Sequence, residues 1–288
     1  MWIFAGVLLL LICLFFIAVM IYDSNRFVTV NYRIEDVRIR KRTRIILLAD
    51  LHNKKYGKDN EKLLSAIDAA QPDLILSAGD MMTSVKGKSM EPAERLVEEL
   101  SAKYPFYYAN GNHEYRIYHD EETYGSMGSK YRSALEKCNV CLLENGSVCL
   151  PDLGIRIWGL DLPIDLYKKF RETKISASLL DDLIGKPKEG SYHILLAHNP
   201  AFFESYAEWG ADLTLAGHVH GGVMRLPVLG GVLSTSLTLF PKYDGGLFER
   251  NQKRMIVSRG LGSHTIPIRV FNPAELVVID LDTTVQRR

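Results

Sequence analysis

Five segments of the chain end in residue types that bind metal ions. In each, a short apolar run is followed at once by a histidine, an aspartate or an asparagine: LLADLH, LILSAGD, YYANGNHE, ILLAHNP and LTLAGHVHG. A single histidine in such a place is more often a hydrogen-bonded structural residue than a ligand. Five of the eight histidines lie in these segments, however, and chance explains that concentration poorly. The candidate ligands are two carboxylates, one amide and four imidazoles: Asp50, Asp80, Asn112, His52, His198, His218 and His220.

This set of donors indicates a particular chemistry. Seven oxygen and nitrogen ligands suit two divalent metal ions. Mn²⁺, Fe and Zn²⁺ accept mixed imidazole and carboxylate ligands, whereas Mg²⁺ and Ca²⁺ prefer oxygen throughout. No thiolate accompanies the set, which argues against a structural zinc site. Two adjacent cations can hold a bridging water as hydroxide and neutralise phosphoryl oxygens, which is the chemistry that a phosphoester hydrolase requires.

The spacing of the candidate ligands supports two metal-binding pairs. Asp50 and His52 are separated by one residue, as are His218 and His220. In an extended chain such side chains point to the same side, so each pair is expected to hold a metal ion. A glycine precedes three of the ligands, where a small residue lets the backbone turn sharply. These glycines are Gly79, Gly111 and Gly217.

The elements that must position these residues follow from the alternation of apolar runs and helical periodicity, which is typical of a layered α/β domain. The expected strands lie at 45–48, 73–78, 106–109, 155–159, 192–197 and 212–216, with short strands after 222 that form a second sheet. The expected helices lie at 60–70, 91–103 and 199–208. Asp59 or Asn60 is expected to cap the first of them. Loops after the carboxyl ends of such strands meet in one crevice, so the candidate ligands are expected to converge there.

The N-terminal segment differs in kind from the rest. Residues 1–22 carry no charged side chain. At a rise of about 1.5 Å per residue they could cross a hydrocarbon core about 30 Å thick, so we expect a transmembrane anchor. A cleavable signal peptide is the alternative, but a basic n-region and a clear cleavage site are missing. Residues 23–43 are expected to be a basic juxtamembrane segment with a first strand, and 44–288 the catalytic domain.

Charge placement predicts the orientation of the anchor. No Lys or Arg precedes the apolar segment, and seven follow it: Arg26, Arg33, Arg38, Arg40, Lys41, Arg42 and Arg44. This asymmetry predicts a single-pass membrane protein with a cytoplasmic catalytic domain. The basic segment lies either against anionic lipid headgroups or, in part, on the solvated face of the first strand. The net charge of +1 gives no reason to expect a nucleic-acid partner.

At these residues the sequence resembles the calcineurin-like metallophosphoesterases over roughly 44–285. The matching blocks are Asp50-Leu-His52, Gly79-Asp80, Gly111-Asn112-His113-Glu114, His198 and Gly217-His218-Val-His220. The stretches GHVHGG, SRGLG and IPIRVFNPAEL are most similar to the small bacterial membrane-associated group, which includes phospholipid-associated phosphodiesterases and UDP-2,3-diacylglucosamine hydrolases. The resemblance implies a four-layer α-β-β-α sandwich of two packed mixed sheets, preceded here by the transmembrane helix.

The resemblance also implies roles for the site residues. Asp50, His52 and His220 would bind one metal ion, and Asn112, His198 and His218 the other. Asp80 would bridge the two ions, and His113 would be the catalytic histidine that is not a ligand. Apart from the resemblance, Glu114 is expected either to orient His113 or to be a solvated loop acid, and His264, in a glycine-rich loop, is a candidate to line the site. Two departures from the family pattern appear, at Met81-Met82-Thr83 and at Val223, and neither removes a ligand.

The expected function is hydrolysis of a phosphodiester or pyrophosphate bond in a lipid-linked substrate, such as UDP-2,3-diacylglucosamine or a phospholipid. A membrane anchor favours an amphipathic substrate because it concentrates the site at the bilayer. Two alternatives are a phosphoesterase for a soluble phosphate ester and a non-catalytic scaffold, which the intact ligand set disfavours. Segment 223–248 is expected to add strands to the second sheet, or else to form an acyl-chain groove or a membrane-dipping surface.

Overall fold

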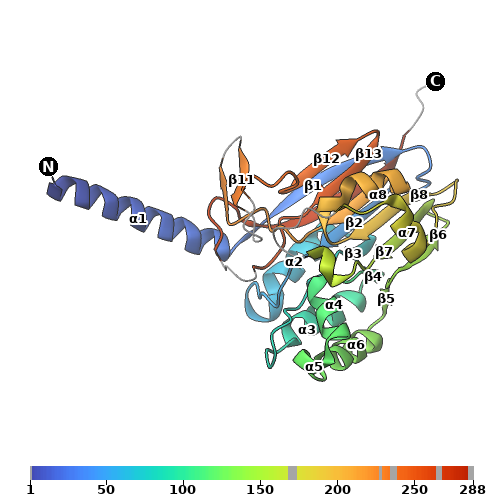
Figure 1. Ribbon diagram of the computed structural model, residues 1–288, viewed down its shortest axis with the longest axis horizontal. Coiled ribbons are helices and arrows are strands. Elements are labelled where there is room, and N and C mark those ends of the chain that lie inside the picture. The colour runs from blue at the N-terminus through green and yellow to red at the C-terminus, as the bar shows by residue number, and fades with distance from the viewer. Residues whose placement is uncertain (1, 168–173, 227–228, 234–238, 264–267, 285–288) are drawn as a thin grey trace.

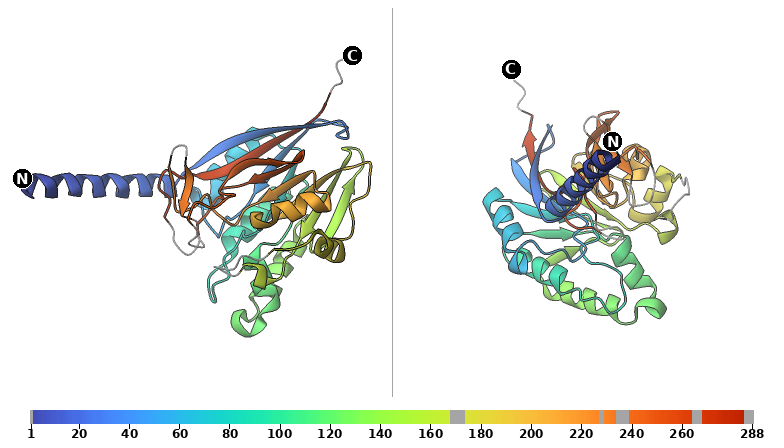
Figure 2. Two further views of the ribbon diagram at one scale, coloured as in Figure 1. Left: turned by 45° about the horizontal axis from the view of Figure 1, so that its top comes forward. Right: turned by 90° about the vertical axis from the view of Figure 1, so that its left-hand side faces the viewer.

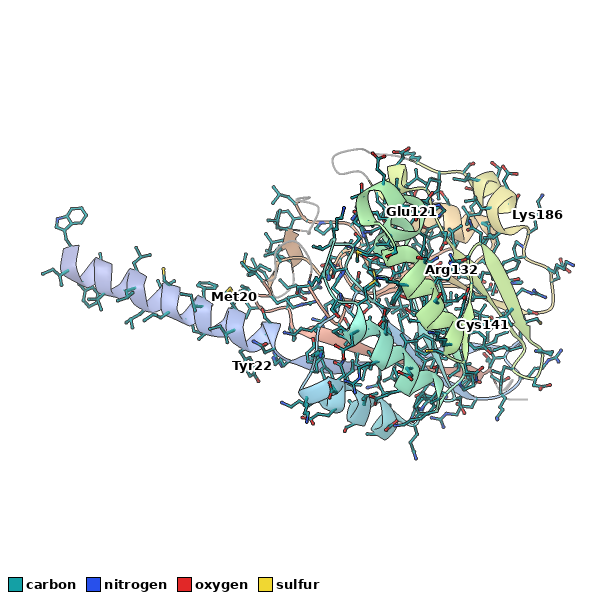
Figure 3. All side chains as sticks on the ribbon, turned by 90° about the horizontal axis from the view of Figure 1, so that it is seen from below. Met20, Tyr22, Glu121, Arg132, Cys141 and Lys186 are labelled. Carbon is teal, nitrogen blue, oxygen red and sulfur yellow. The ribbon has the colours of Figure 1, made fainter. Side chains whose placement is uncertain are left out.

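The computed structural model describes residues 2–167, 174–226, 229–233, 239–263 and 268–284 (Figure 1). The chain begins with α1 (Trp2–Ser24), which projects away from the rest of the molecule in Figure 1 and in the left view of Figure 2. Its apolar side chains point into open space along most of its length, as far as Met20 and Tyr22 near the domain (Figure 3). By length and composition α1 can cross a membrane, although a signal sequence meets the same criteria.

The first sheet has the strand order β1-β14-β2-β3-β4-β5. All neighbouring strands in it are parallel except β14 and β2, which are antiparallel. The sheet is therefore mixed, with the C-terminal strand inserted between the first two strands of the chain. The strands are β1 (Phe27–Asp36), β2 (Thr43–Leu48), β3 (Leu74–Ser77), β4 (Phe106–Tyr108), β5 (Val140–Leu142) and β14 (Ala274–Thr283).

The second sheet has the order β12-β13-β9-β8-β7-β6 and is also mixed, since its outer pairs β12·β13 and β6·β7 are antiparallel. Its strands are β6 (Gly146–Leu150), β7 (Ile155–Leu160), β8 (Tyr192–Ala197), β9 (Leu213–Ala216), β12 (Gly246–Arg250) and β13 (Lys253–Val257). A separate two-stranded hairpin, β10 (Met224–Leu226) and β11 (Gly230–Leu233), lies beside the base of α1 (Figures 1 and 2).

Alternating side chains of β2 divide the core into layers. Ile46 and Leu48 pack in a cluster with the helices that cover the first sheet, whereas Ile45 and Leu47 pack against residues of the second sheet. This two-residue period is what a strand buried on both faces requires. Five helices cover the first sheet: α2 (Glu61–Ala70), α3 (Glu91–Ser101), α4 (Asn112–His119), α5 (Glu121–Tyr124) and α6 (Met127–Lys137). Two cover the second: α7 (Ala177–Ile184) and α8 (Phe203–Trp209).

The four-layer α-β-β-α sandwich is therefore confirmed, with an apolar helix before it, and two details of the prediction are wrong. Asn60 occupies the N-cap of α2, but its Oδ1 accepts a hydrogen bond from Tyr56 N (2.9 Å) and makes no cap. The short strands after 222 do not share one sheet. In the described part of this segment, β12 and β13 join the second sheet, β14 joins the first, and β10 and β11 stand apart.

Most of the basic residues after α1 lie far from it. β1 carries the chain about 33 Å away at about 3.3 Å per residue. Beyond its end Arg38 pairs with Asp36 and Asp212, and Arg44 pairs with Asp280. The expectation that this segment lies against lipid headgroups is wrong for these two residues, because sheet carboxylates already bind them. Arg33 lies on the exposed face of β1, as the alternative held.

Candidate metal centre

All seven predicted ligands lie in loops at the carboxyl ends of five strands. Asp50 and His52 follow β2, Asp80 follows β3, and Asn112 opens α4 just after β4. His198 follows β8, and the pair His218 and His220 follows β9. Six of the seven are buried, and His218 is partly exposed. The two packed sheets thus bring residues 170 positions apart in sequence to one edge, at the join between their layers.

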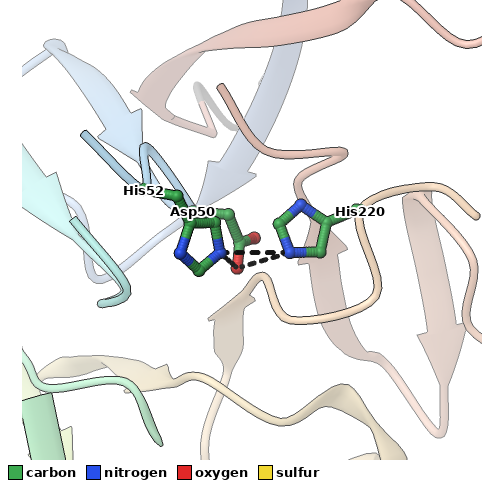
Figure 4. Close-up of side chains that lie close together, drawn as sticks. All are labelled: Asp50, His52 and His220. Atoms are coloured by element: carbon green, nitrogen blue, oxygen red, sulfur yellow. Dashed lines mark hydrogen bonds and ion pairs between the residues drawn. The ribbon is translucent and has the colours of Figure 1, made fainter. Parts of the chain in front are cut away.

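The donor atoms of the seven predicted ligands form two groups, and a third, overlapping group brings His113 together with His52 and Asp80. In the first, His52 Nε2 lies 3.2 Å from His220 Nε2 and 3.8 Å from Asp50 Oδ1 (Figure 4). In the second, the donor atoms of Asp80, His198 and His218 lie within 4.8 Å of one another, with His198 Nε2 3.1 Å from Asp80 Oδ2. Asp80 Oδ2 is also 3.8 Å from His52 Nε2, so this carboxylate lies between the groups.

The hydrogen bonds of the histidines show that the site suits a cation. His220 Nδ1 donates to Gly262 O and His198 Nδ1 donates to Ala78 O, at 3.2 and 2.7 Å. In the neutral tautomer, each Nε2 then carries a lone pair, and that of His198 faces the Asp80 carboxylate. Electron pairs that face each other need a positive charge between them. Burial opposes charge on His198, yet Asp80 still raises the pKa of His198 to about 9.

Asn112 adds a second sign that the site suits a cation. Its Oδ1 is buried and accepts no hydrogen bond within the described part of the chain. An acceptor oxygen without a donor costs about 1–3 kcal/mol when buried, unless an ion or water binds it. Next to it, His113 N donates to Asp80 Oδ1 (2.8 Å), which places Asn112 at the edge of the second group. The mixed oxygen and nitrogen donors thus fit two first-row divalent ions.

The backbone beneath the ligands is strained. Five of the seven have a positive φ: Asp50 (51°), His52 (49°), Asp80 (55°), His218 (72°) and His220 (52°). Non-glycine residues rarely adopt this left-handed conformation, and where they do so in clusters the site is usually functional. The expectation that Asp50–His52 and His218–His220 are extended is therefore wrong. The paired side chains converge because tight turns, and not strands, carry them.

Close contacts explain the glycines. Gly79 has a φ of 92°, and a Cβ there would collide with the backbone N of Gly111. A Cβ on Gly111 would collide with the Asp80 carboxylate, and one on Gly217 with that of Asp50. Sequence reasoning missed a fourth such position, Gly260, where a Cβ would lie 2.7 Å from Asp50 Cβ. The sequence signal that could have identified this position is the SRGLG stretch, in which Gly260 lies.

Glu114 has a different role from the two that were expected. It is fully buried, so it is not a solvated loop acid. Its carboxylate accepts hydrogen bonds from the backbone N of Asp80 (2.8 Å), Met81 (2.9 Å) and Gly111 (3.0 Å), and from Tyr108 OH (2.8 Å). Glu114 therefore joins the loop after β3 to the start of α4, and none of these bonds goes to the His113 ring.

His113 is oriented by the loop after β3. Ser84 N donates to His113 Nδ1 at 2.8 Å. A backbone N–H can only donate, so Nδ1 carries the lone pair and Nε2 carries the proton. Nε2 lies 3.9 Å from Asp80 Oδ2, which directs this N–H toward the two groups of donors. The imidazole is thus held as a neutral hydrogen-bond donor beside the site.

Two further polar residues support the centre and were missed from sequence. Arg269 is buried and donates to the carbonyls of Arg259, Gly260 and Gly262. Burial lowers the pKa of its guanidinium to about 10. Asn272 Nδ2 donates to the carbonyls of His220 (2.8 Å) and Gly222 (2.6 Å). Both lie in the IPIRVFNPAEL stretch. His264, which was expected to line the site, lies outside the described residues.

Comparisons with known proteins agree with this arrangement. An uncharacterized metallophosphoesterase of Campylobacter jejuni is 28% identical over 86% of this chain, which spans only 61% of that protein. The uncharacterized metallophosphoesterase YkuE of Bacillus subtilis is 26% identical over 84% of this chain and 79% of its own length. UDP-2,3-diacylglucosamine pyrophosphatase LpxG of Chlamydia muridarum is 24% identical over 82% of each chain. A family model described as calcineurin-like phosphoesterase matches residues 43–222. The chain therefore belongs to the calcineurin-like phosphoesterase family.

Proposed function

We propose that the protein is a dinuclear-metal hydrolase that cleaves a phosphodiester or pyrophosphate bond in a lipid-linked substrate. The observation that carries this proposal is the placement of the Asp80 carboxylate between two groups of buried donors. Asp50, His52 and His220 would hold one ion. Asn112, His198 and His218 would hold the other, and Asp80 would be shared. Bound there, two divalent ions would supply an activated water and neutralise the phosphoryl charge.

The chain's own residues do the rest. His113 directs Nε2–H toward the site while Ser84 N holds its other nitrogen, so it donates a hydrogen bond to a phosphoryl or leaving oxygen. A fixed donor of this kind contributes about 10²–10³ in turnover. The Glu114 carboxylate binds the backbone N–H groups of Asp80 and Gly111. It thereby holds the two loops together and keeps the shared carboxylate of Asp80 beside Asn112.

A lipid-linked substrate is supported by three observations. α1 is long and apolar enough to cross a bilayer. One relative is named a UDP-2,3-diacylglucosamine pyrophosphatase. The loop of His220 continues directly into the hairpin β10–β11 beside the base of α1. UDP-2,3-diacylglucosamine or a phospholipid would satisfy this setting. Hydrolysis of a soluble phosphate ester by a membrane-tethered enzyme is the second candidate, which the same anchor would allow.

We place residues 1–22 in the membrane as a single-pass anchor. The excess of Lys and Arg after the anchor supports a cytoplasmic catalytic domain of residues 44–288. Residues 23–43 connect the two, with β1 packed into the first sheet of the domain.

The test uses the full chain in detergent, loaded with Mn²⁺. Metal content and hydrolysis of bis-p-nitrophenyl phosphate and p-nitrophenyl phosphate are measured for wild type, Asp80→Ala and His113→Ala, with the exposed His119→Ala as a control. Asp80→Ala is expected to lose metal and activity. His113→Ala should keep its metal and lose about 10²–10³ in turnover. A wild-type protein that binds no metal would contradict the proposal.

Substrate class is tested separately, by comparing kcat/KM for UDP-2,3-diacylglucosamine and for a phospholipid with that for an unacylated UDP-sugar. The lipid-linked proposal expects a large preference for one acylated compound. Equal rates with and without acyl chains would favour the soluble candidate.

A further inference from the structure

We propose that the catalytic domain itself enters the bilayer, through a layer of residues around the base of α1 that we call the interfacial layer. It comprises residues 223–226, 229–233, 239–240 and 268–271. This inference rests on the proposed anchor and deepens the proposed function, because it defines how a lipid-linked phosphate reaches the metal centre. Its occupant is the headgroup and upper acyl region of the membrane.

The orientation of α1 is fixed relative to the domain. Only Asn25 and Arg26 separate α1 from β1. Asp23, in the last turn of the helix, is buried and accepts hydrogen bonds from the Arg26 side chain (2.8 Å) and from Asn272 N (3.2 Å). A buried carboxylate with partners in the domain resists bending at this point. A membrane that α1 crosses therefore meets one particular face of the domain.

The depth of that face follows from two aromatic contacts. Phe271 packs against Phe15 and Phe16 of α1, with ring centroids 6.3 and 6.2 Å apart. A hydrocarbon core about 30 Å thick takes about 20 residues of a helix, so the core ends near residue 22, before the charge of Asp23. Phe15 and Phe16 then lie about 10 Å inside that boundary. Because Phe271 touches them, its side chain must also lie below the boundary.

The interfacial layer continues sideways from Phe271. Arg225 N donates to Val270 O (3.0 Å) and Val270 N donates to Val223 O (3.1 Å), which joins this loop to β10. β10 pairs with β11, and Leu233 of β11 forms a bridge with Leu239. The exposed side chains along this path are large and apolar: Ile268, Phe271, Leu229, Leu239 and Phe240.

Such a group of exposed apolar side chains is costly in water and stable at a membrane surface. Leu239 is 67% exposed and Phe240 57%, in a protein that buries most of its other large apolar residues. Amphipathic helices at a membrane surface bury their apolar faces by about 5–10 Å, a depth similar to the one that Phe271 requires. The geometry of α1 and the composition of the layer thus both favour contact of this face with the membrane.

The interfacial layer is continuous with the metal centre. Gly221 and Gly222 connect His220 to it, and Val223 N donates to Leu233 O at 2.7 Å. Asn272 Nδ2 binds the carbonyls of His220 and Gly222 on one side, while Asn272 N binds Asp23 on the other. An amphiphile can therefore present its phosphate to the metal centre while its acyl chains remain in the bilayer.

Spin labelling of the full chain in phospholipid bilayers tests this inference. In a background without the four native cysteines, single cysteines replace Leu229, Leu239 or Val37. Val37 is 65% exposed and also apolar, but it follows β1 at the end remote from α1, so it is a matched control. Collision rates with oxygen, which concentrates in lipid, and with a water-soluble nickel chelate are compared. We expect a several-fold higher ratio of oxygen to nickel collisions at 229 and 239 than at 37.

Ratios at 229 and 239 equal to that at 37 would overturn the inference. A label at Val7→Cys distinguishes this failure from failure of the anchor, because it reports whether α1 itself lies in lipid. Diester hydrolysis by the same preparations reports separately on the proposed chemistry. An embedded α1 and an active enzyme with aqueous labels at 229 and 239 would reject the interfacial layer alone.

Discussion

At the scale of single residues, His113 shows how one backbone hydrogen bond selects a chemical role. Because Ser84 N donates to His113 Nδ1, the ring can present only an N–H to the site while that bond lasts. Protonation of the ring would break the bond, so the geometry favours a neutral donor over an imidazolium acid. Ser84 Oγ, 2.7 Å from the same nitrogen, is not needed for this selection.

Ser84→Ala is therefore expected to change turnover by only a few-fold, since the backbone N–H remains. His113→Ala, by contrast, removes the donor and should cost about 10²–10³ in kcat. Steady-state kinetics with bis-p-nitrophenyl phosphate, at matched metal content, checks both values. If Ser84→Ala lost as much as His113→Ala, the hydroxyl and not the backbone would orient the ring.

Glu114 supports the metal centre through hydrogen bonds from the backbone of Asp80, Met81 and Gly111. Glu114→Gln replaces a carboxylate that accepts four hydrogen bonds with an amide whose NH₂ faces N–H donors. We expect the free energy of unfolding to decrease by about 1.5–3 kcal/mol and the amount of bound metal to decrease. Urea denaturation and metal analysis measure the two effects. Glu136→Gln, on the exposed face of α6, is the control and should change neither.

At the scale of elements, the loop after β3 packs directly against the start of α4, and the contact is between the backbones of Gly79 and Gly111. Gly79 and Gly87 both have positive φ, at 92° and 78°, but only Gly79 faces a neighbouring backbone. Gly87→Ala should cost about 1 kcal/mol of stability and leave the metal bound, because only the conformation is disfavoured. Gly79→Ala adds the collision with Gly111 and is expected to lose metal and activity. Equal metal content in the two variants would show that the close approach is unimportant.

A histidine between two strands of the second sheet makes stability depend on pH. His193 of β8 accepts a hydrogen bond from Trp158 Nε1 of β7 (3.0 Å), and its other nitrogen is 2.7 Å from Lys188 O. Burial lowers the pKa of His193 below its usual 6.5. As the pH falls, His193 is therefore protonated in the unfolded state before it is protonated in the folded state. The free energy of unfolding decreases as the pH falls below about 6.5, which is the direction expected of a histidine that folding keeps neutral.

His193→Gln removes this titration, so we expect the variant to be less stable than wild type at pH 8 and the difference to shrink by pH 5. Chemical denaturation across this range, with His119→Ala as an exposed control, measures it. A difference that stayed constant with pH would mean that His193 does not stay neutral in the fold.

Elements and ligands were predictable from sequence to different degrees. Apolar runs such as 45–48 mark strands by composition, and the ligand follows each run, so the residues that the structure brings together could be found. The pairing of the strands could not be predicted, because nothing in the sequence of residues 274–283 indicates that this strand inserts between β1 and β2. Arg269 and Asn272 were missed because they bind backbone carbonyls, whose positions exist only in the folded chain.

At the scale of the whole molecule, the anchor and the metal centre share one buried residue. Asn272 is fully buried, and its backbone N–H binds Asp23 at the end of α1 while its side chain holds the loop of His220. A second link lies at the surface, where Lys54 Nζ, two residues after His52, donates to Asn25 Oδ1 (3.2 Å). Loss of the Asn272 amide should therefore loosen one side of the centre, the group of Asp50, His52 and His220, and leave the group around His198 in place.

Asn272→Ala is expected to lower the affinity of that one metal ion by about 10- to 100-fold, the usual effect of removing a residue that positions a ligand. Titration of the full chain with Mn²⁺ should then show two ions of different affinity, where wild type binds both more tightly. Asn31→Ala, on the exposed face of β1, is the matched control and should bind both ions as wild type does. Circular dichroism verifies that each variant is folded. If Asn272→Ala is folded and binds both ions with wild-type affinity, the Asn272 side chain does not hold the His220 loop in the position that metal binding requires.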